Sequence, residues 1–381
     1  MGNGILHKSN LPRGGSQVFK GKMHVKFMPL ERFYKRHREE VEGVLRRVFE
    51  KGRFVDGDEV SLFREEVKGF LGVRHFIPVA SGSDALRLSL EALGVKGRKV
   101  ITTPYTFISP AEAVLQAGGE VEWVDVGEDF LIDPEKIEDA VDERTCGIIP
   151  VHLFGKVCRM DEIMRIAEKH GLFVIEDAAQ AFGSGGAGTR GTCGCFSFHP
   201  TKILGGFGDG GGIATDNDEL AWKLERLRVH GFERKYFSLF PGYNSRLDEI
   251  QAALLRVRLR KLDEEIKRRK EMERIYRKEL GGLVRMLEWK EDEVPGLFPL
   301  LLEDEKARDG LKGYLEKNGI DTAVYYPLPL HLQPVFSEKK RHFLVAESLS
   351  KRVLFIPFHP YLEDDEIYYV VEKIRKFRVR H

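Results

Sequence analysis

A lysine near the middle of the chain stands between a strand-like run and a glycine-rich loop. Lys202 lies in the segment FSFHPTKILGGFGDGGG, where residues 195–198 have the pattern of a buried strand end and Pro200 ends the run. A lysine held against apolar surface loses part of its preference for the charged form, so its amine can form a Schiff base. The segment is compatible with a reactive amine, but one lysine beside glycines is a weak signal, and the segment alone favours a loop lysine beside a structural turn.

A second apolar strand ends in acidic residues. The run VIEDAAQ over residues 174–180 carries Asp177 at its end. A carboxylate is costly to bury without a cationic partner, and a pyridinium N–H is such a partner. That ion pair would keep the ring protonated and electron-withdrawing. The structural alternative is a helix cap by Asp177.

Two more loops carry groups that bind ligands. Residues 80–83, ASGS, precede a helix predicted over residues 83–93, so their hydroxyls and amides could hold a phosphate. A plain helix cap by Ser83 is the alternative. In the loop PYTF, Phe107 could stack on a flat heteroaromatic ring or be an ordinary core residue. The first loop lacks G-x-G-x-x-G, which disfavours a nicotinamide site.

Strand-like and helix-like runs alternate around these loops. The predicted strands cover residues 76–80, 99–103, 120–126, 147–153, 173–176, 195–198 and 212–215. Such alternation predicts an α/β fold with a mostly parallel central sheet covered by helices. Because ligands bind where parallel strands end, the four loops should meet at one edge of the sheet.

The chain divides into three predicted regions. Residues 1–22 lack periodicity and indicate a disordered extension or an expression remnant. Residues 23–250 form the large domain and begin with a helix over residues 30–51. Residues 251–381 hold a long linking helix and a smaller C-terminal α+β domain. The charge run 256–270 in the linking helix favours a solvated helix face.

Composition limits the kinds of partner. The 381 residues are 42% hydrophobic, and 61 Lys and Arg against 60 Asp and Glu leave a net charge of +1. No bulk field attracts nucleic acid or an anionic membrane, so small molecules are the expected partners. No apolar run reaches the roughly twenty residues of a membrane span, which favours a cytoplasmic protein. The four cysteines lack zinc-site spacing and read as buried thiols, so no metal is expected.

Taken in order, the motifs resemble those of the DegT/StrS family of sugar-nucleotide aminotransferases. The resemblance extends from about Phe27 to Arg378, and its carriers are SGSDAL, PYTF, VIEDAAQAFG, FSFHPTK, GDGGGIATDND, GYNSRLDEIQAALL and YYPLPLHLQP. It implies a fold type I enzyme that depends on pyridoxal 5'-phosphate (PLP). It also implies a homodimer whose active site is shared across the interface.

The resemblance assigns roles by position. Lys202 matches the Schiff-base lysine, Asp177 the partner of the pyridine nitrogen, and Gln180 the contact to the ring hydroxyl. Other matched positions are the phosphate ligands Gly82, Ser83 and Ser197, the ring-stacking Phe107, Asn244 reaching the neighbouring subunit's phosphate, and the substrate-side Arg246 and His331. Tyr325 stands where many members have histidine, which bears on the sugar contacts.

The implied reaction moves an amino group from L-glutamate to a keto group of a nucleotide-linked hexose. The product is an aminosugar nucleotide for glycan or polysaccharide biosynthesis. The segments RVHGFERKY and IPFHPYL favour amination at C3, with C4 as the alternative. Lys202 argues against the dehydratase branch, which has histidine there. A PLP-binding regulatory protein without turnover is the remaining rival.

Overall fold

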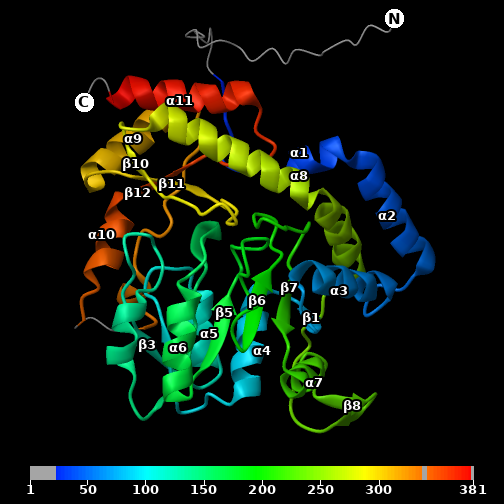
Figure 1. Cartoon of the computed structure of the whole chain (residues 1–381). Helices are drawn as coiled ribbons and strands as arrows, with labels where there is room; N and C mark the ends of the chain where they lie inside the picture. Colours follow the sequence, from blue (N-terminus) through cyan, green and yellow to red (C-terminus); the bar gives the residue numbers. More distant parts are fainter. Residues whose placement is uncertain (1–22, 337–340, 379–381) are drawn as a thin grey trace, which may run out of the picture.

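The computed structural model describes residues 23–336 and 341–378, so the predicted extension over residues 1–22 lies outside the described part. Figure 1 shows a large sheet with its helices in the lower half of the view. The long helix α8 crosses above this sheet, the smaller sheet lies at the left beneath the C-terminal end of α8, and α11 runs along the top of the view. The large sheet and the smaller sheet with its helices are therefore two distinct parts of the fold, with α8 running across both.

Seven strands form the large sheet in the order β1-β7-β6-β5-β4-β2-β3. They are β1 His75–Val79, β2 Lys99–Thr102, β3 Glu120–Trp123, β4 Thr145–Ile148, β5 Phe173–Asp177, β6 Cys193–Ser197 and β7 Gly211–Thr215. Strands β6, β5, β4, β2 and β3 run parallel, while β7 is antiparallel to both of its neighbours. The predicted mostly parallel sheet is confirmed.

Two predicted strands were too long. Strand β3 ends at Trp123 and β4 at Ile148, although the apolar runs continue to residues 126 and 153. Val126 instead forms an isolated bridge with Ile132, and Leu153–Gly155 forms a 3-10 turn. An apolar run shows that residues are buried but does not tell a strand from a buried loop.

Helices cover both faces of the large sheet. The helices of this part are α1 Glu31–Arg36, α2 Arg38–Lys51, α3 Asp58–Leu71, α4 Gly82–Leu93, α5 Ser109–Gln116, α6 Met160–His170 and α7 Asp218–Leu227, with the hairpin β8 Phe232–Arg234 and β9 Phe237–Ser238. Alternation along β1 sends Phe76 to a core with α3 and α8, and Ile77 to a core with α4 and α7.

Two helix predictions need correction. The helix predicted over residues 30–51 is divided between α1 and α2 at His37. The side chain that caps α4 belongs to Ser81, whose hydroxyl accepts the Asp84 N–H, and not to Ser83. Gly94 ends α4 with φ +75°, a conformation that glycine adopts without strain.

The second sheet is antiparallel and contains residues from beyond the linking helix. It consists of β10 Arg285–Met286, β11 Phe298–Leu301 and β12 Val353–Ile356, accompanied by α9 Glu305–Lys317, α10 Leu344–Arg352 and α11 Asp364–Arg378. Phe355 of β12 packs edge-on against Phe154, with ring centroids 4.8 Å apart. The two sheets therefore share part of one core.

Helix α8, Glu249–Leu280, corrects the prediction for the charged run. Arg258, Glu265 and Arg269 are buried instead of solvated. Their spacings of 7 and 11 residues place them on one face of the helix. This face contacts the Phe33 ring, the Tyr361 hydroxyl and the Gly296 carbonyl. The spacing of these three charges therefore indicates a buried face, although the run as a whole is rich in charge.

Candidate functional site

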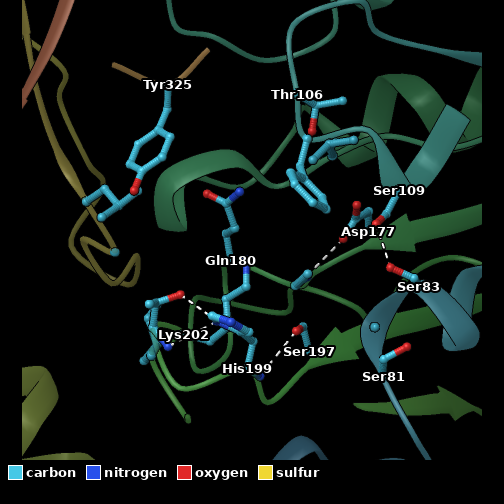
Figure 2. Close-up of a pocket in the computed structure, with 18 of the residues that line it drawn as sticks. Ser81, Ser83, Thr106, Ser109, Asp177, Gln180, Ser197, His199, Lys202 and Tyr325 are labelled. Atoms are coloured by element: carbon cyan, nitrogen blue, oxygen red, sulfur yellow. Dashed lines mark hydrogen bonds between the residues drawn. The ribbon is translucent and has the colours of Figure 1, made fainter. Parts of the chain in front are cut away.

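A cavity of about 430 Å³ lies at the carboxyl ends of the parallel strands. Seven of the residues singled out in the sequence line it: Gly82, Ser83, Phe107, Asp177, Gln180, Ser197 and Lys202. In Figure 2, Asp177, Gln180 and Lys202 surround one space, with Ser81 and Ser83 on one side and Tyr325 on the other. The four loops thus meet at one sheet edge.

Lys202 reaches this cavity from the turn that follows β6. Its backbone N–H donates to the His199 carbonyl at 2.9 Å, which closes the turn. Burial lowers the pKa of the Lys202 amine, and the Asp177 carboxylate only partly opposes this effect. Among the described residues, the amine nitrogen has no hydrogen-bond partner. The lowered pKa favours the neutral, nucleophilic amine more than in an exposed lysine.

Asp177 is the last residue of β5, and only 5% of it is exposed. One carboxylate oxygen accepts the Ala179 N–H at 3.0 Å, which makes a local turn and not the cap of a helix. Burial raises the pKa of Asp177, while the Ala179 N–H and the Lys202 amine pull it down. A cation placed in the cavity would compensate this buried carboxylate.

A buried pair supports Asp177 from the opposite face of the sheet. His152 Nε2 lies 2.7 Å from Glu176 Oε2, and neither side chain is exposed. The His152 Nδ1 atom accepts the Cys158 N–H at 3.2 Å, so Nε2 carries the proton that Glu176 accepts. The backbone N–H of His152 donates separately to the backbone carbonyl of Asp177 at 2.9 Å. The pair therefore locks β5 to the end of β4.

We expect Glu176→Ala to lower the free energy of unfolding by about 3–5 kcal/mol, because several buried donors lose their acceptor. Besides His152, the Glu176 carboxylate accepts backbone N–H groups of Gly188, Arg190 and Gly191 at 2.9, 2.6 and 2.6 Å. Denaturant titration at neutral pH measures the change.

The charge state of Glu176 fixes the sign of this effect with pH. Burial raises its pKa, but His152 and the backbone N–H groups outweigh burial and hold the pKa below the usual value. The stabilisation is therefore present at neutral pH and disappears as pH falls through the folded pKa. The exposed Glu143 supplies the control variant Glu143→Ala, and an equal loss in both variants would refute the role of the pair.

The N-terminus of α4 forms the opposite side of the cavity. The hydroxyls of Ser83 and Ser109 lie 2.6 Å apart, and Ser81 caps the helix. A Cβ added at Gly82 would lie 2.8 Å from the Ser197 Cβ, so only glycine fits between α4 and β6. Backbone N–H groups, hydroxyls and the helix dipole together suit a phosphate.

Gln180, Phe107 and Tyr325 also line the cavity. The Gln180 amide donates from Nε2 to the Tyr326 hydroxyl at 3.1 Å and accepts the Phe154 N–H at Oε1 at 3.2 Å. Phe107 lines the cavity and is 54% exposed, so it is not a core residue. Tyr325 also lines the cavity, and burial raises its pKa, which keeps the phenol neutral.

Three predicted positions do not line this cavity. Asn244 is exposed, and the Arg246 guanidinium lies 3.8 Å from the Asp56 carboxylate. His331 is buried, with Nε2 3.3 Å from Glu347 Oε1 and its ring packed on Phe343. Within one protomer, these residues therefore have no contact with the space around Lys202.

Several lining residues were not identified from the sequence. They are Met28, Thr106, Ser109, Thr201, Asp209, Leu297 and Tyr326, together with His199, to which no chemical role was assigned. Thr106 and Thr201 lie within the motifs PYTF and FSFHPTK, which could have suggested them, but nothing local pointed to Met28. The described residues contain no group of three or more His, Cys, Asp or Glu that could hold a metal ion. None of their helices is long and apolar enough to span a membrane.

Comparison with known proteins gives one consistent result. Residues 35–375 match the model of the DegT/DnrJ/EryC1/StrS aminotransferase family. A "Pleiotropic regulatory protein" of Geobacillus stearothermophilus is 42% identical over 93% of this chain and 99% of its own length. A UDP-N-acetyl-3-dehydro-alpha-D-glucosamine 3-aminotransferase of Acidithiobacillus ferrooxidans is 40% identical over 89% and 94%.

A solved structure gives the same answer for the fold. The crystal structure of S. venezuelae DesV in complex with a ketimine intermediate has a TM-score of 0.90 and 37% identity, covering 94% of this chain and 99% of its own. The expected fold type I is therefore confirmed. Aminotransferases of this family depend on PLP, in agreement with the expected cofactor. The chain belongs to the DegT/DnrJ/EryC1/StrS aminotransferase family.

Proposed function

We propose that this aminotransferase moves an amino group from L-glutamate to the C3 keto group of a nucleotide-linked hexose, which yields an aminosugar nucleotide. The observation that carries the proposal is the presence of Lys202 and Asp177 in one cavity, beside the N-terminus of α4. A cytoplasmic homodimer completes the proposal.

The residues around the cavity fit PLP. A buried carboxylate at Asp177 suits the ring nitrogen, the α4 N-terminus with Ser83 and Ser197 suits the phosphate, and Lys202 suits the aldehyde carbon. Phe107 and Gln180 would contact the ring face and its hydroxyl. When bound, PLP supplies an electron-accepting ring that takes up the electron pair released as the donor's α-carbon loses its proton.

Lys202 supplies the proton transfers. Because burial lowers its pKa, the neutral amine at Nζ is more populated near neutral pH than in an exposed lysine. Nζ would accept the proton of the donor's α-carbon and later deliver a proton to the carbon that gains the amino group. Asp177 would hold its carboxylate against the ring nitrogen throughout, which keeps that nitrogen protonated.

The acceptor follows from the relatives' chemistry. The Acidithiobacillus relative is named a 3-aminotransferase of a UDP-linked sugar, which supports C3 over the C4 alternative. Tyr325 lies in the cavity wall with a neutral phenol, which would donate a hydrogen bond to a sugar hydroxyl bound there. Arg246 and His331 stay as proposed substrate-side residues, which would need contacts beyond those within one protomer.

The test is a pair of half-reactions followed by absorbance and product analysis. With PLP and L-glutamate, the protein should consume the visible band of the bound cofactor and release 2-oxoglutarate. A nucleotide-linked 3-keto-hexose should then restore the band and yield a C3-aminated product, identified by mass spectrometry and NMR. Turnover of 4-keto sugars alone would replace C3 by C4, and consumption of glutamate with neither sugar would reject the acceptor class.

A second candidate is a PLP-binding regulatory protein without turnover. The name of the Geobacillus relative is the observation that favours it. Both candidates use the Lys202 amine to hold PLP, so only turnover distinguishes them. Steady release of 2-oxoglutarate in the presence of both substrates excludes this candidate.

We expect mixing of two inactive variants to restore activity if the active site is shared between subunits. Lys202→Ala removes the amine, and Asn244→Asp places a negative charge against the partner's phosphate site. A hybrid dimer has one intact site, so random mixing should recover about a quarter of wild-type activity. Activity is assayed after denaturation and joint refolding. Hybrids that form without any recovery would contradict the shared site.

A further inference from the structure

Arg269 of α8 is a buried guanidinium without a carboxylate partner. It is 1% exposed, and no described Asp or Glu lies within ion-pair distance of it. Its Nη1 atom donates to the carbonyl of Gly296 at 3.0 Å and approaches that of Pro295 at 3.4 Å. Burial lowers its pKa to about 10. The guanidinium also lies over the Phe358 ring, 6.0 Å from its centroid, but no carboxylate neutralises it. A buried charge of this kind is costly, so its contacts with the backbone of Pro295 and Gly296 call for a functional explanation.

The carbonyl that Arg269 contacts belongs to the cavity wall. Gly296 lines the cavity, and its N–H donates to the Phe154 carbonyl at 2.9 Å. Trp289 Nε1 donates to the same carbonyl at 3.1 Å. The Phe154 N–H in turn donates to Gln180 Oε1 at 3.2 Å. A continuous set of hydrogen bonds therefore joins α8 to Gln180.

This set determines which way the Gln180 amide faces. A backbone N–H can only donate, so the atom facing Phe154 must be the amide oxygen. The amide nitrogen is then directed to the other side, where it donates to the Tyr326 hydroxyl at 3.1 Å. Since Gln180 and Tyr326 both line the cavity, the second N–H of the amide is available to a ligand there.

The turn that presents the Phe154 N–H is tightly confined. Phe154 has φ +58°, a left-handed conformation that is unusual for a bulky residue. The next residue, Gly155, has φ +90°, and a Cβ there would lie 1.8 Å from the Val294 carbonyl oxygen. The segment 294–296 therefore restrains this turn. Arg269 in turn holds that segment through its contacts with the Pro295 and Gly296 carbonyls.

We propose that Arg269 and Trp289 are positioning residues that act through the Phe154 turn to orient the Gln180 amide towards the ring hydroxyl of PLP. The inference rests on the proposed function, because it uses the PLP contact proposed for Gln180. It goes beyond that function by assigning a role to α8, whose charged run contacts neither cofactor nor substrate. A hydrogen-bond donor to the ring oxygen lowers the basicity of that oxygen. Loss of the donor should therefore raise the pKa of the protonated nitrogen beside the oxygen.

The test is the pH titration of the visible band of the PLP-loaded protein, in the absence of substrates. We expect Arg269→Met to move the titration midpoint upward by about 0.4 to 1 unit, the shift that corresponds to one ordinary hydrogen bond. Arg268→Met is the matched control, because the neighbouring Arg268 pairs with Asp364 at 2.7 Å and faces away from the turn. Its midpoint should equal that of the wild type.

A second, more conservative variant tests the inference even if Arg269→Met fails to fold. Trp289→Phe removes one donor to the Phe154 carbonyl but keeps an aromatic ring beside Phe298, so its midpoint should shift in the same direction. Trp222→Phe is its control, since the Trp222 indole is 46% exposed. PLP affinity, measured by fluorescence at fixed pH, should fall severalfold in Trp289→Phe and stay unchanged in Trp222→Phe.

A double-mutant cycle separates positioning from general packing. In a Gln180→Leu background, Arg269→Met should cause no further shift of the midpoint, because the group on which it acts is gone. An additive shift would overturn the inference, as would unchanged midpoints in both Arg269→Met and Trp289→Phe. If the wild-type protein with PLP shows no visible band that Lys202→Ala abolishes, the proposed function and this inference both fail. If the wild-type band is normal but the midpoints of Arg269→Met and Trp289→Phe are unchanged, only this inference fails and the proposed function stands.

Discussion

Lys202→Ala should reduce kcat by at least about 10⁴-fold, because the variant loses both the covalent anchor and the base. The reason lies in the environment of the amine. Burial lowers the pKa of Lys202, so the neutral amine required for both tasks is more populated than in an exposed lysine. Single-turnover absorbance with L-glutamate measures the loss directly, since this step needs no keto-sugar.

Lys202→Arg sharpens this experiment. A guanidinium keeps the positive charge but stays protonated at every usable pH, so it can neither form a Schiff base nor accept a proton. We expect it to be as inactive as the alanine variant. The exposed Lys267 provides the control Lys267→Ala, which should retain wild-type rates. Substantial turnover by either Lys202 variant would refute the assignment of this lysine.

Asp177→Asn should reduce kcat by about 10²–10³-fold, a loss typical of removing one preorganised electrostatic partner. The change keeps the size of the side chain and its acceptor for the Ala179 N–H, so the fold should persist. The variant loses only the negative charge that is proposed to face the ring nitrogen of PLP. Steady-state kinetics at saturating PLP separates this loss from weaker cofactor binding.

The same variant should shift the pH profile in a defined direction. The Asp177 carboxylate favours the ammonium form of Lys202 and so raises its pKa. Removing the carboxylate lowers the pKa of Lys202 further, and the rate of PLP capture by the cofactor-free protein should rise at lower pH than in the wild type. Asp161→Asn, at a carboxylate 87% exposed, is the control. A shift to higher pH would contradict the electrostatic coupling.

The order of strands and loops could be predicted because it depends on local patterns. Apolar runs that end in SGS, PYTF, EDAAQ and HPTK are readable along the chain, and parallel strands bring their carboxyl ends to one edge. Seven of the ten predicted site residues line one cavity for this reason. The misplaced strand ends near Val126 and Leu153 show the limit, because hydrophobicity reports burial and not hydrogen bonding.

Other features depend on contacts between distant parts of the chain, which no local pattern encodes. Met28 enters the cavity wall from the N-terminal segment, where Val25 bridges to Ile320. Arg269 belongs to a run of charges that resembles a solvated face, and only contact with distant segments such as residues 295–296 buries it.

Motifs along the chain were sufficient to predict the family, the fold class and the residue types suited to chemistry. The folded structure was needed to show which charges are buried, which amide atom of Gln180 faces the cavity and which predicted positions lie away from it. The physical reason is that burial and hydrogen-bond direction arise when distant segments exclude water from one another.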